Sequence, residues 1–153
     1  MKAVIQRVTS ASVSVNGKPV SSIGRGFLIL LGAEKGDGEA EAKALSKKIA
    51  GLRVFRDPDG KMNLSAADVG GEMLVISNFT LCADCSHGNR PSFFGAEAPE
   101  LAEPLYDLFC LDLSSYGYRV GQGMFGADMA VSIENEGPVT IVIDSDDLKK
   151  GRA

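Results

Sequence analysis

Apolar and polar residues alternate near the start of the chain, which is the pattern of β-strands that turn one face to a core. The alternation predicts a strand over residues 3–15 and a returning strand over residues 20–23. Asn16-Gly17 lies between them and predicts a tight hairpin turn, because both residues tolerate a positive φ. The unbroken apolar run at residues 27–31 predicts a third strand that is buried on both faces.

A helical pattern follows, with apolar residues spaced by three and four positions. We expect this helix to have Asp37 as its N-cap, because an aspartate there accepts hydrogen bonds from free backbone N–H groups. Glu39 and Glu41 favour the same start, since carboxylates stabilise a helix N-terminus. The apolar residues expected on its inner side are Ala42, Leu45, Ile49 and Leu52.

The middle of the chain predicts a turn, a long strand and a second helix. The segment 57–60 (Asp-Pro-Asp-Gly) has the composition of a turn. Residues 72–81 predict a central strand, and the second helix is expected to begin near Pro99, since proline is favoured in a first helical turn. The side chains expected to point inward from this helix are Leu101, Leu105, Leu108 and Phe109.

Two more strands complete the predicted secondary structure. Residues 129–133 alternate as one strand, residues 135–138 (Asn-Glu-Gly-Pro) predict a turn, and residues 139–143 predict a closing strand. Strands therefore dominate, with two main helices. This pattern indicates the α+β class, with a largely antiparallel or mixed sheet.

The composition is typical of a soluble protein of one domain, which we expect to span residues 1–153. Hydrophobic residues make up 44% and charged residues 24% of the chain, and no apolar run is long enough to cross a bilayer. No signal peptide is recognisable, so we expect a cytoplasmic location and no membrane partner. The net charge of −4 argues against nonspecific coating of nucleic acid, but allows a local basic cluster to contact one end of an RNA.

Two cysteines spaced by two residues, Cys82 and Cys85, lie close to the only histidine, His87. Such a cluster suggests a zinc site or redox chemistry. A closed zinc site needs four ligands, however, and Cys110 falls on the core-facing side of the second predicted helix. Redox pairs usually open a helix, whereas this pair follows a strand. We therefore expect free thiols, no metal and no cofactor.

Residue chemistry alone leaves the other candidates structural. Ser77 and Thr80 carry hydroxyl groups at the end of a buried strand, but no base is evident beside them to make either a nucleophile. Gly137-Pro138 is common in tight connections and does not by itself indicate a cis peptide bond. The segment 90–94 (Arg-Pro-Ser-Phe-Phe) could hold a phosphate or stack on a base, or simply anchor a loop.

Several motifs, in order along nearly the whole chain, resemble those of the D-aminoacyl-tRNA deacylases. Residues 77–81 (Ser-Asn-Phe-Thr-Leu) resemble that family's Ser-Gln-Phe-Thr-Leu motif, and residues 135–140 (Asn-Glu-Gly-Pro-Val-Thr) resemble its Asn-x-Gly-Pro-Val-Thr motif. The shorter matches are Gln6-Arg7-Val8, Lys61-Met62-Asn63, Arg90-Pro91-Ser92-Phe93, Leu105-Tyr106 and Phe125-Gly126-Ala127-Asp128-Met129. Either long motif alone is weak, but the ordered set is specific.

The resemblance implies a dimeric α+β fold with a mixed, largely antiparallel, barrel-like sheet, and an enzyme that hydrolyses the ester of D-aminoacyl-tRNA. Its site would lie at the interface of a homodimer and receive the 3′ end of the tRNA. Gly137-Pro138 would be cis and would enter the partner's pocket, facing residues 77–80. If the carbonyls of Gly137 and Pro138 hold the substrate's α-amino group, an L side chain must clash with the dipeptide, whereas a D side chain points away from it. Glycine has no side chain to exclude, so glycyl-tRNA would also be hydrolysed.

The resemblance also assigns roles to residues. The catalytic set is Ser77, Asn78, Phe79 and Thr80, in which the N–H groups of Phe79 and Thr80 are directed at the developing oxyanion. We favour attack by water, assisted by the ribose 2′-hydroxyl, with Thr80 as a positioning group; an acyl-enzyme on Thr80 is the alternative. The substrate-binding set is Gly137, Pro138, Arg7, Phe125 and Met129.

Within the binding set, Arg7 is expected to brace the Gly-Pro turn, and Phe125 and Met129 to line the pocket of the terminal nucleotide. Asn78 departs from the family's usual glutamine by one methylene, which leaves its effect on the pocket open. Two rival functions are L-alanyl-tRNA editing through a relaxed Gly-Pro geometry and noncatalytic tRNA binding. Retention of Arg7 argues against the first, and the pI of about 5.0 argues against the second.

Overall fold

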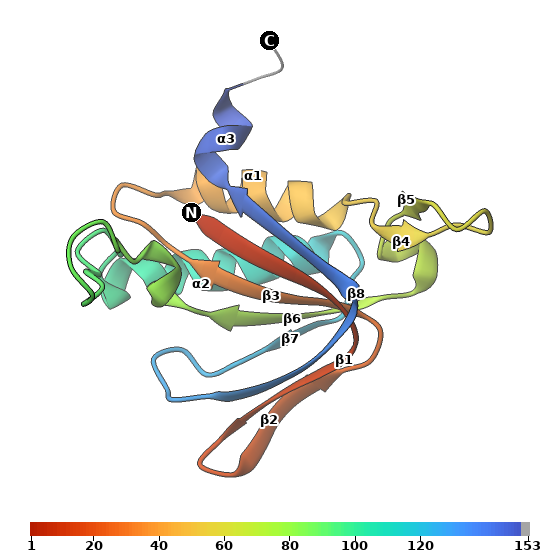
Figure 1. The fold of residues 1–153 in the computed structure, drawn as a ribbon, viewed down its shortest axis with the longest axis horizontal. Coiled ribbons are helices and arrows are strands. Elements are labelled where there is room, and N and C mark those ends of the chain that lie inside the picture. The colour runs from red at the N-terminus through yellow and green to blue at the C-terminus, as the bar shows by residue number, and fades with distance from the viewer. Residues whose placement is uncertain (151–153) are drawn as a thin grey trace.

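Strand β1 (Lys2–Val15) is the centre of the sheet in the computed structural model, which describes residues 1–150. It pairs antiparallel with β3 (Gly26–Gly32) through its first half and with β2 (Lys18–Ile23) through its second half. Strand β8 (Ala130–Asp144) runs antiparallel along nearly the whole of β1 (Figure 1). The strands predicted over the first third of the chain are confirmed.

Two of the three predicted turns are confirmed, those at Asn16-Gly17 and at residues 57–60. Asn16 and Gly17 join β1 to β2 with φ values of 51° and 76°, which is the positive φ that such a hairpin needs. The segment 57–60 joins two short strands, β4 (Phe55–Arg56) and β5 (Met62–Leu64), which form a small separate hairpin. These short strands lie at the edge of the domain (Figure 1).

The other edge of β3 carries two parallel neighbours, β6 (Glu72–Ser77) and then β7 (Val120–Gln122). The two ends of this sheet approach each other, because Arg119, next to β7, donates a hydrogen bond from its guanidinium to the Ser22 carbonyl of β2 at 3.2 Å. The domain is therefore a mixed sheet that is nearly closed into a barrel.

Three α-helices accompany the sheet within residues 1–150, which is one more than predicted. They are α1 (Glu39–Ala50), α2 (Pro99–Ser115) and α3 (Ser145–Lys149). The carboxylate of Asp144 caps α3 by accepting the N–H of Asp146 at 2.9 Å. A helix of five residues is too short to show a helical period of apolar positions, so the sequence pattern could not reveal α3.

Two details of the predicted helices are wrong. The N-cap of α1 is Gly38 rather than Asp37, whose carboxylate instead accepts the Glu34 N–H at 2.7 Å and holds the loop before the helix. Leu101 of α2 is 60% exposed, whereas Leu105 is buried. Leu101 comes one position before the apolar stripe of α2 that faces the core. That stripe consists of Ala102, Tyr106, Phe109 and Leu113.

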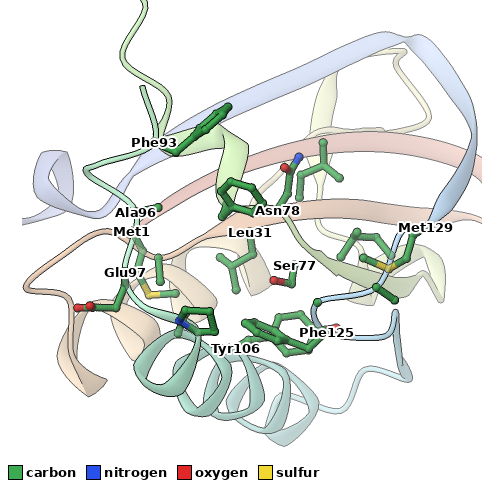
Figure 2. A pocket seen from close by; sticks show the side chains of 18 of the residues that line it. Met1, Leu31, Ser77, Asn78, Phe93, Ala96, Glu97, Tyr106, Phe125 and Met129 are labelled. Carbon is green, nitrogen blue, oxygen red and sulfur yellow. The ribbon is translucent and has the colours of Figure 1, made fainter. Parts of the chain in front are cut away.

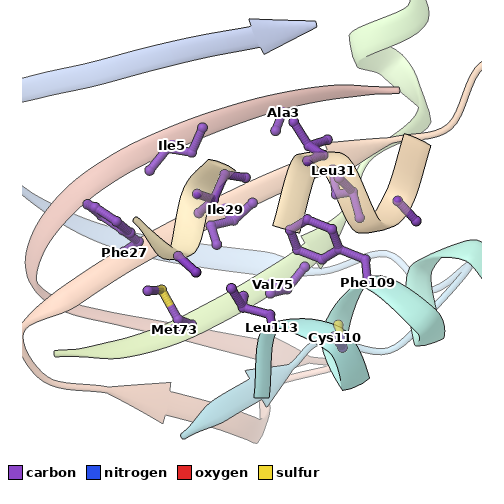
Figure 3. Packing of buried hydrophobic residues seen from close by; sticks show 14 of the residues in the cluster. Ala3, Ile5, Phe27, Ile29, Leu31, Met73, Val75, Phe109, Cys110 and Leu113 are labelled. Atoms are coloured by element: carbon purple, nitrogen blue, oxygen red, sulfur yellow. The ribbon is translucent and has the colours of Figure 1, made fainter. Parts of the chain in front are cut away.

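The main core lies between the sheet and the two long helices (Figure 3). Cys110 points into it from α2, as predicted. The large side chains at its centre are Phe27, Ile29, Met73, Val75, Phe109 and Leu113. The opposite face of the same strands encloses a smaller apolar cluster, made of Val8, Ala11, Val13, Ile23, Leu28, Leu74 and Ile76. No helix in the described part of the chain has the length and apolar character to cross a membrane.

Strand β6 ends at Ser77, four residues earlier than the strand predicted over 72–81. The chain then leaves the sheet through a 3₁₀ turn, Phe79–Cys82. Asn78 makes this exit, with its N–H donating to the Leu31 carbonyl at 2.8 Å. A Cβ at Gly32 would lie 2.9 Å from the Asn78 carbonyl oxygen, so the close approach of the two segments depends on that glycine.

The predicted turn at residues 135–138 is wrong, because these residues form a bulge within one long strand. Val8 of β1 pairs with Asn135 and Gln6 pairs with Thr140, so a single residue, Arg7, faces the four residues between those two partners. The Asn135 side chain closes the bulge by accepting the Val139 N–H at 3.0 Å. Asn, Gly and Pro favour bulges as well as turns, and only the register with β1 distinguishes the two.

Candidate functional site

A cavity of about 760 Å³ opens where β3 and β6 end (Figure 2). One side is formed by Ser77, Asn78 and Phe79, and the opposite side by the loop that leads into β8. The first turns of α2 and the segment before it close the third side. The residues labelled around it in Figure 2 are Met1, Leu31, Ser77, Asn78, Phe93, Ala96, Glu97, Tyr106, Phe125 and Met129.

The predicted catalytic segment borders this cavity, but only three of its four residues line it. Ser77, Asn78 and Phe79 line the cavity, whereas Thr80 is exposed next to it. The Thr80 hydroxyl donates to the Asn78 side-chain oxygen at 2.5 Å. The N–H groups of Phe79 and Thr80 make no hydrogen bond within residues 1–150, because they open a 3₁₀ turn. They are free to donate to a bound oxygen atom.

The opposite wall contains Phe125 and Met129, together with Tyr106. The rings of Tyr106 and Phe125 lie 6.0 Å apart, and the Tyr106 hydroxyl donates to the Val75 carbonyl at 2.7 Å. Burial raises the pKa of the Tyr106 hydroxyl, so this group stays protonated and acts as a donor. Sequence reasoning gave Tyr106 no role beyond its place in a matched dipeptide; its position on the α2 stripe was the available signal.

Arg7 and the Gly137-Pro138 dipeptide form a second group of predicted site residues. Arg7 is only 3% exposed; its Nε donates to the Glu136 carbonyl at 3.2 Å and its Nη1 to the Val54 carbonyl at 2.7 Å. The peptide bond between Gly137 and Pro138 is cis, and both residues are exposed. Arg7 thus fixes the base of a bulge whose tip faces solvent.

The two groups are separated along the sheet. Arg7 pairs with Phe27 of β3, whereas Ser77 of β6 pairs with Leu31 of the same strand. Four residues of extended chain span about 13 Å. Gly137 and Pro138 are also absent from the lining of the cavity. Within one chain, therefore, the Gly137-Pro138 dipeptide lies apart from residues 77–80.

The Cys82-Cys85-His87 cluster is divided between the core and the surface. Cys82 is buried with its Sγ 3.4 Å from the Ala33 carbonyl, and burial raises the pKa of its thiol. Cys85 is exposed, and His87 contacts the Ser86 hydroxyl through Nδ1 at 2.8 Å. Among residues 1–150, no three potential metal ligands of the His, Cys, Asp and Glu types lie grouped together.

Comparison with known proteins gives a consistent relationship over almost the whole chain. Proteins called D-aminoacyl-tRNA deacylase from Roseiflexus castenholzii and Desulfatibacillum aliphaticivorans are 55% and 54% identical over 145 residues. These alignments cover 95% of this chain and 92% and 99% of the two relatives.

Two solved structures share the fold. The c-Myc DNA Unwinding Element Binding Protein is 44% identical, with a TM-score of 0.88 over 94% of this chain and 98% of that one. A probable eukaryotic D-amino acid tRNA deacylase, at 20% identity, has a TM-score of 0.74 over 93% and 97% of the two chains. The family model described as D-Tyr-tRNA(Tyr) deacylase matches residues 4–144. This chain therefore belongs to the D-Tyr-tRNA(Tyr) deacylase family.

Proposed function

We propose that this chain hydrolyses the ester of D-aminoacyl-tRNA, and that each site is shared between two copies of the chain. The cavity of one copy would receive the aminoacylated 3′ end, and Gly137-Pro138 of the second copy would close it. The observation that carries the shared site is that the exposed dipeptide lies opposite Arg7, whose partner Phe27 is four residues, or about 13 Å, along β3 from the position that pairs with Ser77. A dipeptide that is rigidly braced yet faces solvent is suited to act on a neighbouring molecule.

The selection between enantiomers would rest on backbone atoms. The carbonyl groups of Gly137 and Pro138 have no partner in the ladder between β1 and β8 and can accept hydrogen bonds from an α-ammonium group. Once that group and the ester carbonyl are held, one of the two remaining directions at Cα points into the dipeptide. An L side chain must enter that direction, whereas a D side chain points into the open cavity. Glycine has no side chain to exclude, so glycyl-tRNA should also be hydrolysed.

The chemistry would need little from side chains. A water molecule attacks the ester carbonyl carbon, the bond to the ribose oxygen breaks, and the leaving ribose oxygen takes a proton. The free N–H groups of Phe79 and Thr80 are available to stabilise the oxyanion that develops between these steps. The neighbouring 2′-hydroxyl of the ribose can orient the water. His87 is exposed and hydrogen-bonded to Ser86, and is not needed as a base.

Thr80 acts as a positioning group in this mechanism, because its hydroxyl proton is donated to an amide oxygen, which is not a base. We expect Thr80→Ala to lower kcat by less than about tenfold, since one neutral hydrogen bond contributes about 0.5–1.5 kcal/mol. Single-turnover hydrolysis of D-tyrosyl-tRNA measures this, with Thr80→Ser as the control that keeps the hydroxyl. A fall to background, together with an acyl-enzyme trapped in the wild type by acid quench, would show instead that Thr80 is the nucleophile.

The proposed function is tested by deacylation of matched D- and L-tyrosyl-tRNA. We expect the D-ester to be hydrolysed at least about 1,000-fold faster than the L-ester, because a steric clash in a rigid site costs several kcal/mol. L-Alanyl-tRNA in a third reaction tests the relaxed editing function. Preferential release of L-alanine, or binding of tRNA without release of any amino acid, would contradict the proposal.

A further inference from the structure

Three phenylalanines form an exposed aromatic strip beside the mouth of the cavity. Phe79, Phe93 and Phe94 are 57%, 40% and 81% exposed, although rings of this size are usually buried. Phe79 and Phe93 meet edge to face, with centroids 5.2 Å apart, and both line the cavity. Phe94 follows directly in the chain, is the most exposed of the three and does not line the cavity.

A cation accompanies the outer end of this strip. The Lys35 ammonium lies 3.4 Å from the centroid of the Phe94 ring, so it occupies one face of the ring and leaves the other face open. The two segments are held together by the backbone, because the Lys35 N–H donates to the Gly95 carbonyl at 3.0 Å and Glu34 bridges to Ala96. The cation and the ring are therefore presented as a fixed pair.

We propose that the Lys35-Phe94 pair, continuing from Phe93, binds the single-stranded nucleotides that precede the terminal aminoacylated nucleoside of the tRNA. This inference rests on the proposed function, which places that nucleoside in the cavity. The pair offers the two elements that single-stranded nucleic acid needs, an aromatic face for a base and a cation for a phosphate.

The occupant is inferred to be RNA rather than a second protein because of what surrounds the ring. The strip is continuous with the cavity that is proposed to receive the tRNA end, because Phe79 and Phe93 line that cavity and Phe94 follows Phe93 in the chain. The segment before it adds the exposed guanidinium of Arg90, which makes no ion pair within residues 1–150. The neighbouring carboxylates have other partners, since Glu34 pairs with Lys2 at 3.2 Å and Glu97 accepts the Gly36 N–H at 3.3 Å, which leaves the Lys35 ammonium available to a phosphate.

The test compares two substrates that share the same ester, full-length D-tyrosyl-tRNA and D-tyrosyl-adenosine, which lacks every preceding nucleotide. We expect Phe94→Ala to lower kcat/KM for the tRNA about tenfold, because loss of one stacked base has an effect of that order, and to change kcat/KM for D-tyrosyl-adenosine less than twofold. Phe94→Tyr keeps the stacking face and should restore the tRNA value. Lys35→Gln should reduce the slope of log kcat/KM against log salt by about 0.7 for the tRNA alone, as for one lost phosphate contact.

Two exposed residues away from the cavity provide matched controls, Leu111→Ala for the loss of apolar surface and Lys48→Gln for the loss of a cation. Neither should distinguish the two substrates. Equal effects of Phe94→Ala on both substrates, or none on either, would overturn the inference, as would a change of oligomeric state in that variant. Failure of the wild type to hydrolyse D-tyrosyl-adenosine and D-tyrosyl-tRNA would instead refute the proposed function itself.

Discussion

Gly137→Ala should reduce kcat/KM for D-tyrosyl-tRNA by at least about 100-fold, because misplacement of a positioning group by about 1 Å has an effect of that size. Gly137 has φ +130°, a conformation that L residues rarely adopt, and a Cβ there would lie 2.9 Å from the Val139 nitrogen and 3.2 Å from Arg7 Nη2. The bulge must therefore shift, and the added methyl group also occupies the surface that is proposed to meet the substrate. We expect a loss of about 1–3 kcal/mol in the free energy of unfolding as well.

Gly117→Ala distinguishes the effect of backbone strain on stability from the effect of an added methyl group on the substrate contact. Gly117 has φ +95°, so alanine is strained there too, but a Cβ at this position meets nothing within 4 Å and the residue is not part of the cavity lining. We expect Gly117→Ala to lower the melting temperature and to leave deacylation unchanged. Unchanged hydrolysis of the D-ester by Gly137→Ala would rule out the proposed contact between this dipeptide and the substrate.

Arg7→Ala should have the second large effect, on both stability and discrimination. The substitution leaves the buried Val54 carbonyl without its donor, at a cost of about 1–3 kcal/mol, and also removes the donor of the partly buried Glu136 carbonyl. The base of the bulge is then no longer fixed. We expect kcat/KM for D-tyrosyl-tRNA to fall by about 100-fold and the ratio of D- to L-ester hydrolysis to fall with it. Deacylation of both esters and thermal unfolding measure the two effects.

Arg7→Lys keeps the prediction testable if Arg7→Ala fails to fold. Lysine keeps the charge but cannot supply two donors in a fixed planar arrangement, so the bulge that carries Gly137-Pro138 should be held less well in a folded protein. The exposed Arg56 offers the matched control, and Arg56→Ala should alter neither measurement. A folded Arg7→Lys variant with wild-type discrimination would show that Arg7 contributes only to stability.

Local patterns predicted the strands and tight turns well, because alternation and positive-φ residues act over a few positions. The errors arise where a tertiary contact determines the end of a helix or strand. Asp37 has the chemistry of an N-cap, but its carboxylate bonds the Glu34 N–H one turn earlier. Residues 72–81 read as one strand, yet the chain leaves the sheet at Ser77, where β3 also ends and Gly32 admits the Asn78 backbone. Neither contact is visible in a local window of sequence.

The candidate site could be predicted only through the resemblance to a family. Taken singly, Thr80 and Gly137-Pro138 are ordinary residues of a turn and a bulge. Their proposed roles use backbone N–H and carbonyl groups, which do not depend on residue type, and only the structure shows that these groups are unpaired. Arg7 is more informative, since a nearly buried arginine must be paired. The sequence offers base stacking as one of three roles for the segment 90–94, but the exposure of Phe93 and Phe94, which favours that role, follows from the structure alone.

The sharing of the site between two chains is tested most directly with a heterodimer of two inactive variants. One copy carries Gly137→Ala, and the other carries Ser77→Phe, which places a ring in the cavity; the two copies have different C-terminal affinity tags and are purified together. Because the proposed dimer is symmetric, one of its two sites then combines an intact cavity with an intact dipeptide. The account predicts about half of the wild-type turnover of D-tyrosyl-tRNA. A heterodimer as inactive as its parents, or copies that do not purify together, would contradict it.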